Sequence, residues 1–576
     1  MPDLPPTAPL CLDFRNTNTL WCSVLVETLH RCGVRTAVVS PGSRSTPLTV
    51  ALARHPGIEA IPALDERSAA FFALGRAKRT RRPVVLVCTS GTASANYLPA
   101  LVEAHESGAP LLAITADRPP ELRDCASGQT IDQQKLYGGQ VEFYHEFAVP
   151  EPRLELLRYL RQTAAYACGR TLAPRPGPVH LNAPFRDPLA PVADATAEPL
   201  RGKLDETFFA HLAPADTAAV TVLWTPPLTT RGVIVAGPAS PADPVAHARA
   251  VGRIARTLGW PVLADALSPV RHHPAEGACI VARYDALLRD EAQAAVLAPE
   301  AVLCVDGWPT SKVLRGWLER SGAEAVQVSA TPANRDGLHL RTRRIEADIA
   351  DLIVAAPRPE EEYVMRWAAA ETATSARIDS ALAAETELFE PKATWLLARH
   401  LPAETPVFVA GSMPVRDVEC FWPQNERRPR FYFNRGANGI DGTLSTALGV
   451  AHGGRPAVLL TGDLSLLHDT NGFLLGPKLR GSLTIVLIDN GGGGIFEHLP
   501  VARFEPPFEA YFATPQEVDF GKLCAAYGVE HVPIRDWAQF AELTAGLPET
   551  GVRVLHLRTD RKRDAARRKA LLAGRE

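Results

Sequence analysis

The sequence lacks the features that place a protein in a membrane, outside the cell or on a nucleic acid. No uncharged apolar run is long enough to cross a bilayer, and the first residues contain no basic segment followed by an apolar stretch. The ten cysteines form no Cys-x-x-Cys pair and no cluster with histidine, which argues against a zinc site. The formal net charge is only −3, so no global field attracts a polyanion. We therefore expect a cytoplasmic protein with reduced thiols, no membrane insertion and no nucleic-acid partner.

What the sequence does contain is a recurring order of short β-branched runs, turns bearing glycine or serine, and helical stretches. The chain has 576 residues, of which 46% are hydrophobic, so it is long enough for several cores. The recurring order is typical of parallel α/β units, which bind ligands at the carboxyl ends of their strands. We expect strands at 36–39, 84–87 and 111–114 in a first block, at 232–237, 261–265 and 301–306 in a second, and at 407–410, 457–460 and 484–488 in a third.

The segments outside these blocks predict connections and a tail. Residues 188–230 are rich in proline, alanine and aspartate, which favours a linker, and residues 360–384 predict a long polar helix. The charged, alanine-rich tail 558–576 predicts a helix or a frayed end without a chemical role. The fold class is therefore expected to be α/β, with three doubly wound parallel-sheet domains.

Polar residues follow two apolar runs of the third block. One run ends in Thr-Gly-Asp with Asp463, and another ends in Asn490 followed by four glycines, 27 residues further on. That interval accommodates a crossover helix, which would set the two turns side by side at one edge of a parallel sheet. Carboxylate, amide and backbone oxygens are ligands of Mg²⁺, and glycines let the backbone approach a diphosphate. The pair predicts a metal–diphosphate site, although each motif alone could be an ordinary turn or a flexible loop.

Three further segments give a specific resemblance. Ser-Pro-Gly-Ser-Arg-Ser-Thr-Pro-Leu at 40–48, Thr-Ala-Asp-Arg-Pro-Pro-Glu-Leu at 115–122 and Asn-Arg-Gly-Ala-Asn-Gly-Ile-Asp-Gly at 434–442 accompany the Gly-Asp and Asn motifs. Together these motifs resemble the thiamine-diphosphate enzymes that make SEPHCHC (2-succinyl-5-enolpyruvyl-6-hydroxy-3-cyclohexene-1-carboxylate) in menaquinone biosynthesis. The resemblance extends in order from about residue 15 to beyond residue 555.

The resemblance implies an activity, two cofactors and an assembly. The family are transferases that decarboxylate 2-oxoglutarate on thiamine diphosphate, with Mg²⁺ or Mn²⁺, and add the resulting four-carbon carbanion equivalent to isochorismate. It implies a pyrimidine-binding domain at 1–190, a middle domain at 191–360 and a diphosphate- and metal-binding domain at 361–576. Because the family builds each cofactor site between domains of two subunits, a homodimer or a dimer of dimers is implied.

The resemblance also implies roles for residues of the cofactor site. Glu66 would bind N1′ of the aminopyrimidine, and Ile440 would be the apolar wedge that bends the cofactor, although an ordinary core isoleucine is an open alternative. Asp463 and Asn490 would bind the metal, with the carbonyl of Gly492 as third ligand. The remaining residues matched to cofactor contacts are Ser412, Gly462, Leu464, Ser465 and Ile495.

The substrates give an independent argument for a cationic site. Each carries two carboxylates, and arginine binds carboxylates in a bidentate manner. Five cations match substrate-site or catalytic positions of the family, namely Arg44, Arg118, Lys312, Arg416 and Arg435. Weaker polar candidates are Ser43, Gln129 and Ser412, with Gln129 among the catalytic positions, and the apolar wall is assigned to Phe496 and Leu499.

Four positions depart from the family pattern: Gly128, Val313, Asp489 and Gly494. The first two replace polar contacts to isochorismate and make substrate positioning less certain. Two other functions stay open: a different 2-oxo acid decarboxylase or carboligase, similar to acetohydroxyacid synthase, and a catalytically inactive binding protein on the same fold. A nucleotide-binding dehydrogenase is disfavoured because no Gly-x-Gly-x-x-Gly lies at a first strand-to-helix turn.

Overall fold

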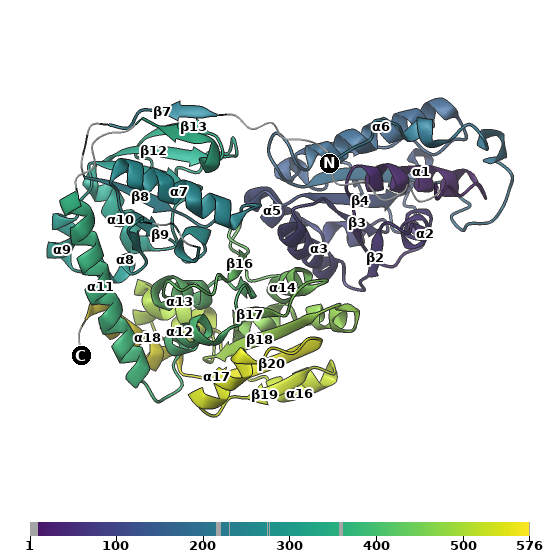
Figure 1. The fold of residues 1–576 in the computed structure, drawn as a ribbon. Coiled ribbons are helices and arrows are strands. Elements are labelled where there is room, and N and C mark those ends of the chain that lie inside the picture. Colours follow the sequence, from purple (N-terminus) through teal and green to yellow (C-terminus); the bar gives the residue numbers. More distant parts are fainter. Residues whose placement is uncertain are drawn as a thin grey trace. The chain divides into compact units, whose positions relative to one another are not determined.

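The structure is a computed structural model that describes residues 10–214, 221–227, 229, 231–273, 275, 277–355 and 361–574. The chain divides into two compact units (Figure 1). The first comprises Met1–Thr217 with Arg435–Gly449, and the second comprises Ala218–Asn434 with Val450–Glu576. Each unit is described in turn below.

The first unit is built on a six-stranded sheet in the order β2-β1-β3-β4-β6-β5, in which every pair is parallel. The strands are β1 (Thr36–Val39), β2 (Glu59–Pro62), β3 (Val84–Cys88), β4 (Leu111–Asp117), β5 (Phe143–Glu146) and β6 (Val179–Pro184). The helices are α1 (Thr17–Arg31), α2 (Thr46–Arg54), α3 (Glu66–Thr80), α4 (Thr92–Ala95), α5 (Leu98–Ser107) and α6 (Leu154–Arg170). The predicted strands of the first block are therefore present.

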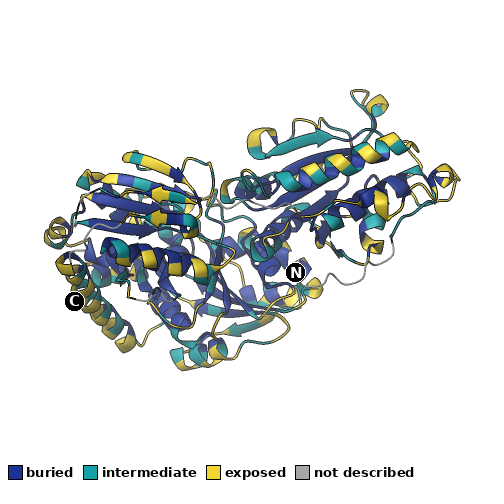
Figure 2. Ribbon diagram, turned by 45° about the horizontal axis from the view of Figure 1, so that its top comes forward, coloured by how far each residue is buried: buried dark blue, intermediate teal, exposed yellow. Residues whose placement is uncertain are grey.

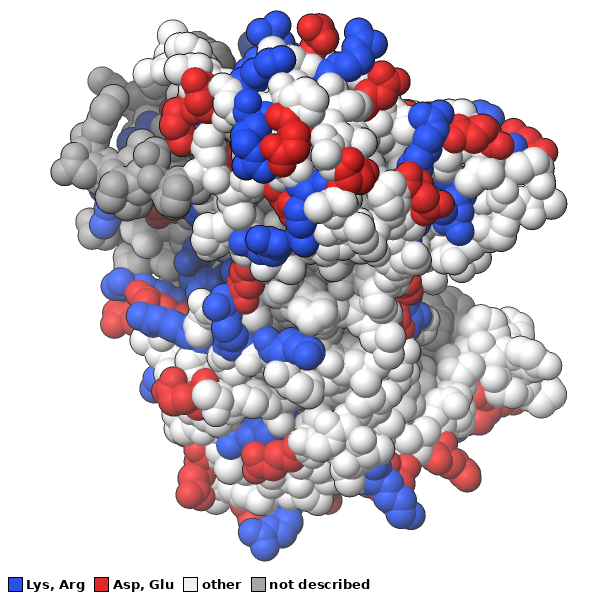
Figure 3. Space-filling view, turned by 90° about the vertical axis from the view of Figure 1, so that its right-hand side faces the viewer, with Lys and Arg blue, Asp and Glu red and all other residues white. Residues whose placement is uncertain are grey.

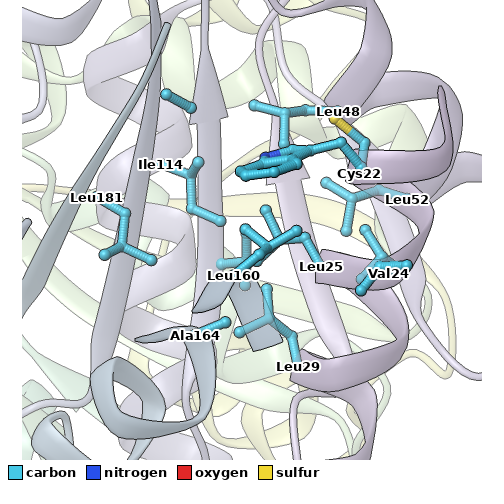
Figure 4. Packing of buried hydrophobic residues seen from close by; sticks show 14 of the residues in the cluster. Cys22, Val24, Leu25, Leu29, Leu48, Leu52, Ile114, Leu160, Ala164 and Leu181 are labelled. Atoms are coloured by element: carbon cyan, nitrogen blue, oxygen red, sulfur yellow. The ribbon is translucent and has the colours of Figure 1, made fainter. Parts of the chain in front are cut away.

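Apolar strands buried on both faces explain the two layers of helices on this sheet. Strands β3 and β4 are buried along their whole length. One face packs against α1, α2 and α6, whose residues Leu25, Leu48 and Leu160 lie in one apolar cluster with Ile114 of β4 (Figure 4). Helix α3 contacts β1, β3 and β4, as well as α5, so the sheet is wound on both sides.

Residues of the segment Arg435–Gly449 pack closely on helix α3 within the first unit. A Cβ atom on Gly75 would lie 2.0 Å from the carbonyl oxygen of Thr446, and one on Gly449 would lie 2.1 Å from that of Phe72. Only glycine permits such backbone contact at these two positions. A segment from the third sequence block therefore belongs structurally to the first unit.

The second unit contains two six-stranded parallel sheets. The first has the order β10-β9-β8-β11-β12-β13, and a two-stranded sheet pairs β14 with β7. Its strands are β7 (Val222–Trp224), β8 (Gly232–Ala236), β9 (Val262–Ala264), β10 (Ile280–Val281), β11 (Ala301–Val305), β12 (Glu324–Ser329), β13 (Arg341–Glu346) and β14 (Leu352–Val354). Its helices are α7 (Pro244–Leu258), α8 (Tyr284–Leu287), α9 (Glu291–Val296), α10 (Lys312–Ser321) and the long α11 (Glu361–Ala384).

The other sheet of this unit has the order β16-β15-β17-β18-β20-β19. Its strands are β15 (Pro406–Val409), β16 (Arg430–Phe433), β17 (Ala457–Gly462), β18 (Ser482–Asp489), β19 (Glu530–Pro533) and β20 (Gly551–Arg558). The helices are α12 (Glu390–His400), α13 (Met413–Phe421), α14 (Thr443–Ala451, which begins in the first unit), α15 (Asp463–His468), α16 (Phe520–Ala526), α17 (Trp537–Ala545) and α18 (Arg561–Ala573). Three parallel six-stranded α/β sheets confirm the predicted fold class.

Strand pairing brings the predicted metal residues to one edge. Strands β17 and β18 are parallel neighbours, with Leu460 opposite Val486 and Gly462 opposite Ile488. Asp463 and Asn490 each follow the carboxyl end of one of these strands. The crossover expected between them is therefore confirmed.

The distribution of side chains agrees with the sequence expectations for a folded α/β chain. Buried positions concentrate in the sheets and on the inner faces of helices (Figure 2). On the face shown in Figure 3, basic and acidic side chains are interspersed.

Within the described ranges, no helix combines the length and apolar character needed to cross a membrane. All ten cysteines are free.

A buried histidine makes the first unit sensitive to acid. His180 on β6 is 1% exposed and its Nε2 lies 2.7 Å from Oγ1 of Thr115. Burial lowers the pKa of His180 from 6.5 to about 3. Between these pH values the unfolded chain binds a proton that the folded chain does not, so stability falls as the pH drops through 6.5.

We expect His180→Gln to reduce this pH dependence. Titration of this one histidine should lower the free energy of unfolding by about 1.4 kcal/mol between pH 7.5 and 5.5. Denaturant unfolding at the two pH values measures the difference, with His211→Asn as a control because His211 is exposed in the same unit. Equal pH dependence in wild type and His180→Gln would contradict the assignment.

Candidate functional site

Arg44 lies in the turn after β1, at the carboxyl edge of the first sheet. Its side chain is buried, and its Nη1 donates to the carbonyl oxygen of Phe185 at 2.9 Å. Its Nε is buried without a hydrogen-bond partner. A buried guanidinium with an unused donor is suited to binding an anion. Ser43, the neighbouring predicted residue, is exposed.

Arg118 and Gln129 are held against the turn that follows β3. Arg118 donates through Nη1 to Oγ of Ser90, and through Nη2 to the carbonyl of Gly128 at 2.9 Å. Gln129 adopts a φ of 59° and donates through Nε2 to the carbonyl of Ser90 at 3.0 Å. The structure thus brings Arg118 and Gln129 together on Ser90. Gly128, one of the departures from the family pattern, takes part in this contact through its backbone carbonyl.

The two arginines of this edge lie close enough to influence each other. Burial lowers the pKa of Arg44, and the positive charge of Arg118 lowers it further. Two guanidinium groups that repel each other are stabilised when a carboxylate lies between them. The carboxylates of Asp187 and Asp117 act on the pKa of Arg44 in the opposite direction, and Asp187 lies 3.9 Å from its Nη1, so the edge carries charges of both signs with the two arginines as its candidate anion-binding groups.

Glu66 is the first residue of α3. Asp65 caps that helix, since its Oδ1 accepts hydrogen bonds from the backbone N–H groups of Arg67 and Ser68. Burial raises the pKa of the Cys88 thiol, and the charge of Glu66 contributes in the same direction, which places this carboxylate near the end of β3. Glu66 is therefore rigidly presented at the same sheet edge as the turns above.

The segment that carries Arg435 and Ile440 is fixed in the first unit by a buried carboxylate. Glu103 of α5 accepts hydrogen bonds from the backbone N–H groups of Gly436 at 3.1 Å and Ala437 at 2.7 Å. Lys78 of α3 donates to Glu103 at 3.0 Å. Lys78 and Glu103 could not be identified from the sequence, because nothing near Glu103 shows that residues more than 300 positions away lie beside it.

Asp463 ties together the two polar turns of the third sheet. Its side chain is buried, with Oδ1 accepting from the N–H of Leu464 at 2.8 Å and Oδ2 from that of Gly492 at 2.7 Å. Burial raises the pKa of Asp463 to about 6, although these two hydrogen bonds act against the rise. A desolvated carboxylate of this kind favours a bound cation.

Asn490 presents an unsatisfied oxygen in the same turn. Its Nδ2 donates to Oε1 of Glu390 at 2.7 Å, while its Oδ1 is buried without a hydrogen-bond partner. Gly492 has a φ of 125°, and a Cβ atom there would lie 2.3 Å from the carbonyl oxygen of Ala513. The residue must therefore be glycine, and the loop brings its backbone N–H to Asp463.

These observations fit a hard divalent cation. Among the described residues, no group of three or more His, Cys, Asp and Glu side chains is placed to hold a metal. One carboxylate, one unpartnered amide oxygen and a nearby backbone carbonyl form a different donor set, which suits Mg²⁺ that keeps water and phosphate ligands. Four further predicted cofactor residues lie in the two turns: Gly462 caps α15, Leu464 and Ser465 form its first turn, and Ile495 lies in the short 3-10 helix Gly494–His498.

The charged tail forms helix α18, the first of the two structures expected for it, and this helix contacts the loop after β18. Helix α18 buries Arg561, Asp564 and Arg568 on one face. Arg561 donates through Nη1 to the carbonyl of Gly491 at 2.6 Å and also pairs with Glu497 and Glu509. Composition alone cannot distinguish this buried face from a solvent-exposed one. The residues that contact the loop differ from the exposed residues only in the side of the helix on which they lie.

Asp489, the departure beside the metal asparagine, also has a partner in the structure. Its Oδ2 lies 2.9 Å from Nε2 of His556 on β20. Although burial acts in the opposite direction, the hydrogen bond and charge of His556 lower the pKa of Asp489. A hydrogen-bonding partner therefore explains an acid here.

The remaining predicted residues are distributed over the second unit. Ser412 precedes α13 with a φ of 64°, and its carbonyl accepts a hydrogen bond from Arg416. Phe496 packs edge-to-face with Phe512 at 5.8 Å, and Leu499 follows the same 3-10 helix. Lys312 begins α10 and is exposed; in the described part of the chain it forms no hydrogen bond or ion pair with another predicted site residue. Val313 packs against the apolar core of the first sheet of this unit.

Comparison with known proteins defines the class. Three family models match in succession: "Thiamine pyrophosphate enzyme, N-terminal TPP binding domain" at 22–136, "Middle domain of thiamine pyrophosphate" at 204–409, and "Thiamine pyrophosphate enzyme, C-terminal TPP binding domain" at 411–556. These matches cover more than half of the chain and define a thiamine pyrophosphate enzyme.

Individual relatives narrow the family. The chain is 52% identical to the 2-succinyl-5-enolpyruvyl-6-hydroxy-3-cyclohexene-1-carboxylate synthase of Microcystis aeruginosa, over 96% of this chain and 98% of the relative. It is 52% identical to that of Synechococcus sp. strain JA-3-3Ab, with 97% and 96% covered, and 49% identical to that of Trichodesmium erythraeum, with 96% and 98% covered. The chain belongs to this family of thiamine pyrophosphate enzymes.

We expect Asp463→Asn to lose divalent-metal binding, because a neutral amide cannot replace the desolvated carboxylate. Electron paramagnetic resonance of free Mn²⁺, titrated with protein in the presence of thiamine diphosphate, measures the affinity. Asp489→Asn is the matched control, since it removes a neighbouring carboxylate that is paired with His556. Retained Mn²⁺ affinity in Asp463→Asn, or equal losses in both variants, would contradict the site.

Proposed function

We propose that the protein decarboxylates 2-oxoglutarate and adds the four-carbon fragment to isochorismate, which yields SEPHCHC and CO₂ in menaquinone biosynthesis. The observation that carries this proposal is the near full-length similarity to synthases of that name. The chain is a transferase of the thiamine-pyrophosphate class and uses thiamine diphosphate with Mg²⁺ or Mn²⁺.

The cationic edge of the first unit supports dicarboxylate substrates. Arg44 has an unused buried donor, and Arg118 is oriented by Ser90 and Gly128. We assign Arg435, Arg416 and Lys312 to the remaining carboxylates, with Ser43, Gln129 and Ser412 as polar contacts. A pyruvate-specific enzyme of the acetohydroxyacid-synthase type has no need of this arrangement, so the structure favours the dicarboxylate reaction.

The residues of the protein have three tasks at the cofactor: to bind it, to orient it and to hold a proton at it. Thiamine diphosphate, when bound, supplies the electron sink that decarboxylation of a 2-oxo acid requires. Glu66 would hold a proton at N1′ of the aminopyrimidine, and Ile440 would contact the cofactor as its apolar support. Asp463, Asn490 and the carbonyl of Gly492 would hold the metal, which would supply positive charge for the diphosphate. Phe496 and Leu499 form an apolar wall that limits access of water.

The domain boundaries, assembly and location follow from the same family membership. We propose a pyrimidine-binding domain at 1–190, a middle domain at 191–360 and a diphosphate-binding domain at 361–576. Glu66 and Asp463 belong to different compact units. We propose that each site combines these domains from two subunits, in a cytoplasmic homodimer or dimer of dimers.

Reconstitution from purified components tests the reaction. Protein, thiamine diphosphate, Mg²⁺, 2-oxoglutarate and enzymatically generated isochorismate are combined, and loss of isochorismate absorbance is followed together with the product mass. We expect the adduct only when all five are present. Turnover of pyruvate without turnover of 2-oxoglutarate would instead support the acetohydroxyacid-synthase-like alternative.

Glu66→Gln should abolish turnover while diphosphate anchoring persists, since the metal residues belong to the other unit. Turnover is measured in the reconstituted reaction, and cofactor binding by calorimetry with Mg²⁺. Glu121→Gln serves as control, because Glu121 is an exposed carboxylate of the first unit that pairs with Arg186. Activity of Glu66→Gln within about tenfold of wild type would rule out the assigned role.

A further inference from the structure

The orientation of the Asn490 amide is decided by a residue far away in the sequence. An asparagine side chain has a donor end and an acceptor end of nearly equal size, and its contacts decide which end points where. Here Nδ2 donates to Oε1 of Glu390, the first residue of α12, at 2.7 Å. An ionised carboxylate can only accept, so this contact leaves Oδ1 for another partner.

Glu390 is itself fixed by helix α18. Its Oε2 accepts a hydrogen bond from Nη2 of Arg568 at 2.7 Å, and its backbone N–H donates to Asp564 at 3.2 Å. Arg568 also binds Asp417 through Nε at 2.8 Å and Nη2 at 2.9 Å. Exposed fractions of 2% for Glu390 and 5% for Arg568 leave neither charge to be solvated by water.

The buried charges of Arg568 and Glu390 act together on the orientation of the Asn490 amide. Both ends of the Glu390 carboxylate are occupied, one by the arginine and one by the asparagine amide. A guanidinium stabilises the ionised form of a buried carboxylate, and that form rejects the amide oxygen of Asn490. The three side chains therefore form a chain of contacts from α18 through α12 to the turn after β18.

We propose that Arg568 and Glu390 are positioning residues that orient Asn490 Oδ1 for the divalent metal ion. The inference rests on the proposed metal site and adds to it an outer layer supplied by the C-terminal helix. Such outer contacts commonly set the affinity of a metal site, because they hold the ligand in its binding orientation.

Metal affinity of the folded protein tests the inference. Glu390→Gln can offer an NH₂ group to Asn490, which allows the amide to turn, so we expect the Mn²⁺ dissociation constant to rise about tenfold to a hundredfold. Arg568→Met should raise the dissociation constant by a similar factor. Arg568→Lys should raise it less, because lysine retains the positive charge but lacks the planar guanidinium that binds two acceptors at once. Free Mn²⁺ is measured by electron paramagnetic resonance at saturating thiamine diphosphate, and circular dichroism verifies folding.

Two comparison variants separate the possible results. Lys569→Met removes an exposed charge next to Arg568 and should leave the affinity unchanged. Asp463→Asn tests the metal site itself, and normal Mn²⁺ binding by this variant would show that the site is wrong. Loss of Mn²⁺ binding in Asp463→Asn, together with normal binding in Glu390→Gln, would overturn only the positioning role. A destabilising but non-positioning effect would lower the melting temperature without changing the dissociation constant, which also overturns the inference.

Folding failure of one variant does not remove the test. If Glu390→Gln is not folded, Arg568→Lys provides the measurement, since it keeps a buried positive charge beside Glu390 and Asp417. A change of less than about threefold in the Mn²⁺ dissociation constant of folded Arg568→Lys would then overturn the proposal, and a larger change would support it.

Discussion

The two hydrogen bonds accepted by Asp463 are the constraint on which the rest of the second unit's site depends. One joins its carboxylate to the start of α15 and the other to the glycine loop after β18. Parallel pairing of β17 and β18 sets the ends of these strands side by side, and the carboxylate then fixes the spacing of the turns that follow. A single side chain can join the two turns only because the strands are adjacent.

The two units differ in the charged groups that gather at their sheet edges, although the whole chain has a net charge of only −3. The edge of the first sheet presents Arg44 and Arg118, which favour anions, together with the carboxylate of Glu66. The loop edge of the second unit gathers Asp463, Glu390 and Asp417, of which Arg568 neutralises only part. The division matches the chemistry of the proposed partners: carboxylates on one side and a metal ion with its diphosphate on the other. A global charge count hides this local separation.

Much of the fold and part of the site could be predicted from local patterns. Apolar runs such as 84–87 and 484–488 became strands because fully buried parallel strands are continuous apolar segments. Asp463 and Asn490 could be predicted because the chain between them is long enough for a crossover helix that joins two parallel strands. Glu103, Glu390 and Arg568 could not, since each acts through a partner at least 100 positions away and a buried charge looks like any other charge in a sequence. The contacts of the C-terminal helix could not be predicted for the same reason.

The close approach at Gly75 and Gly449 has a consequence for how this protein can change. Both glycines place backbone against backbone where helix α3, which begins with Glu66, meets the segment that follows Arg435. The absence of a methyl group at each position permits this approach, in addition to the hydrogen bonds that Glu103 accepts from Lys78 and from the backbone of the segment. Neither position accepts a side chain unless one backbone moves away from the other, so any substitution there would displace α3, and Glu66 with it, from this segment.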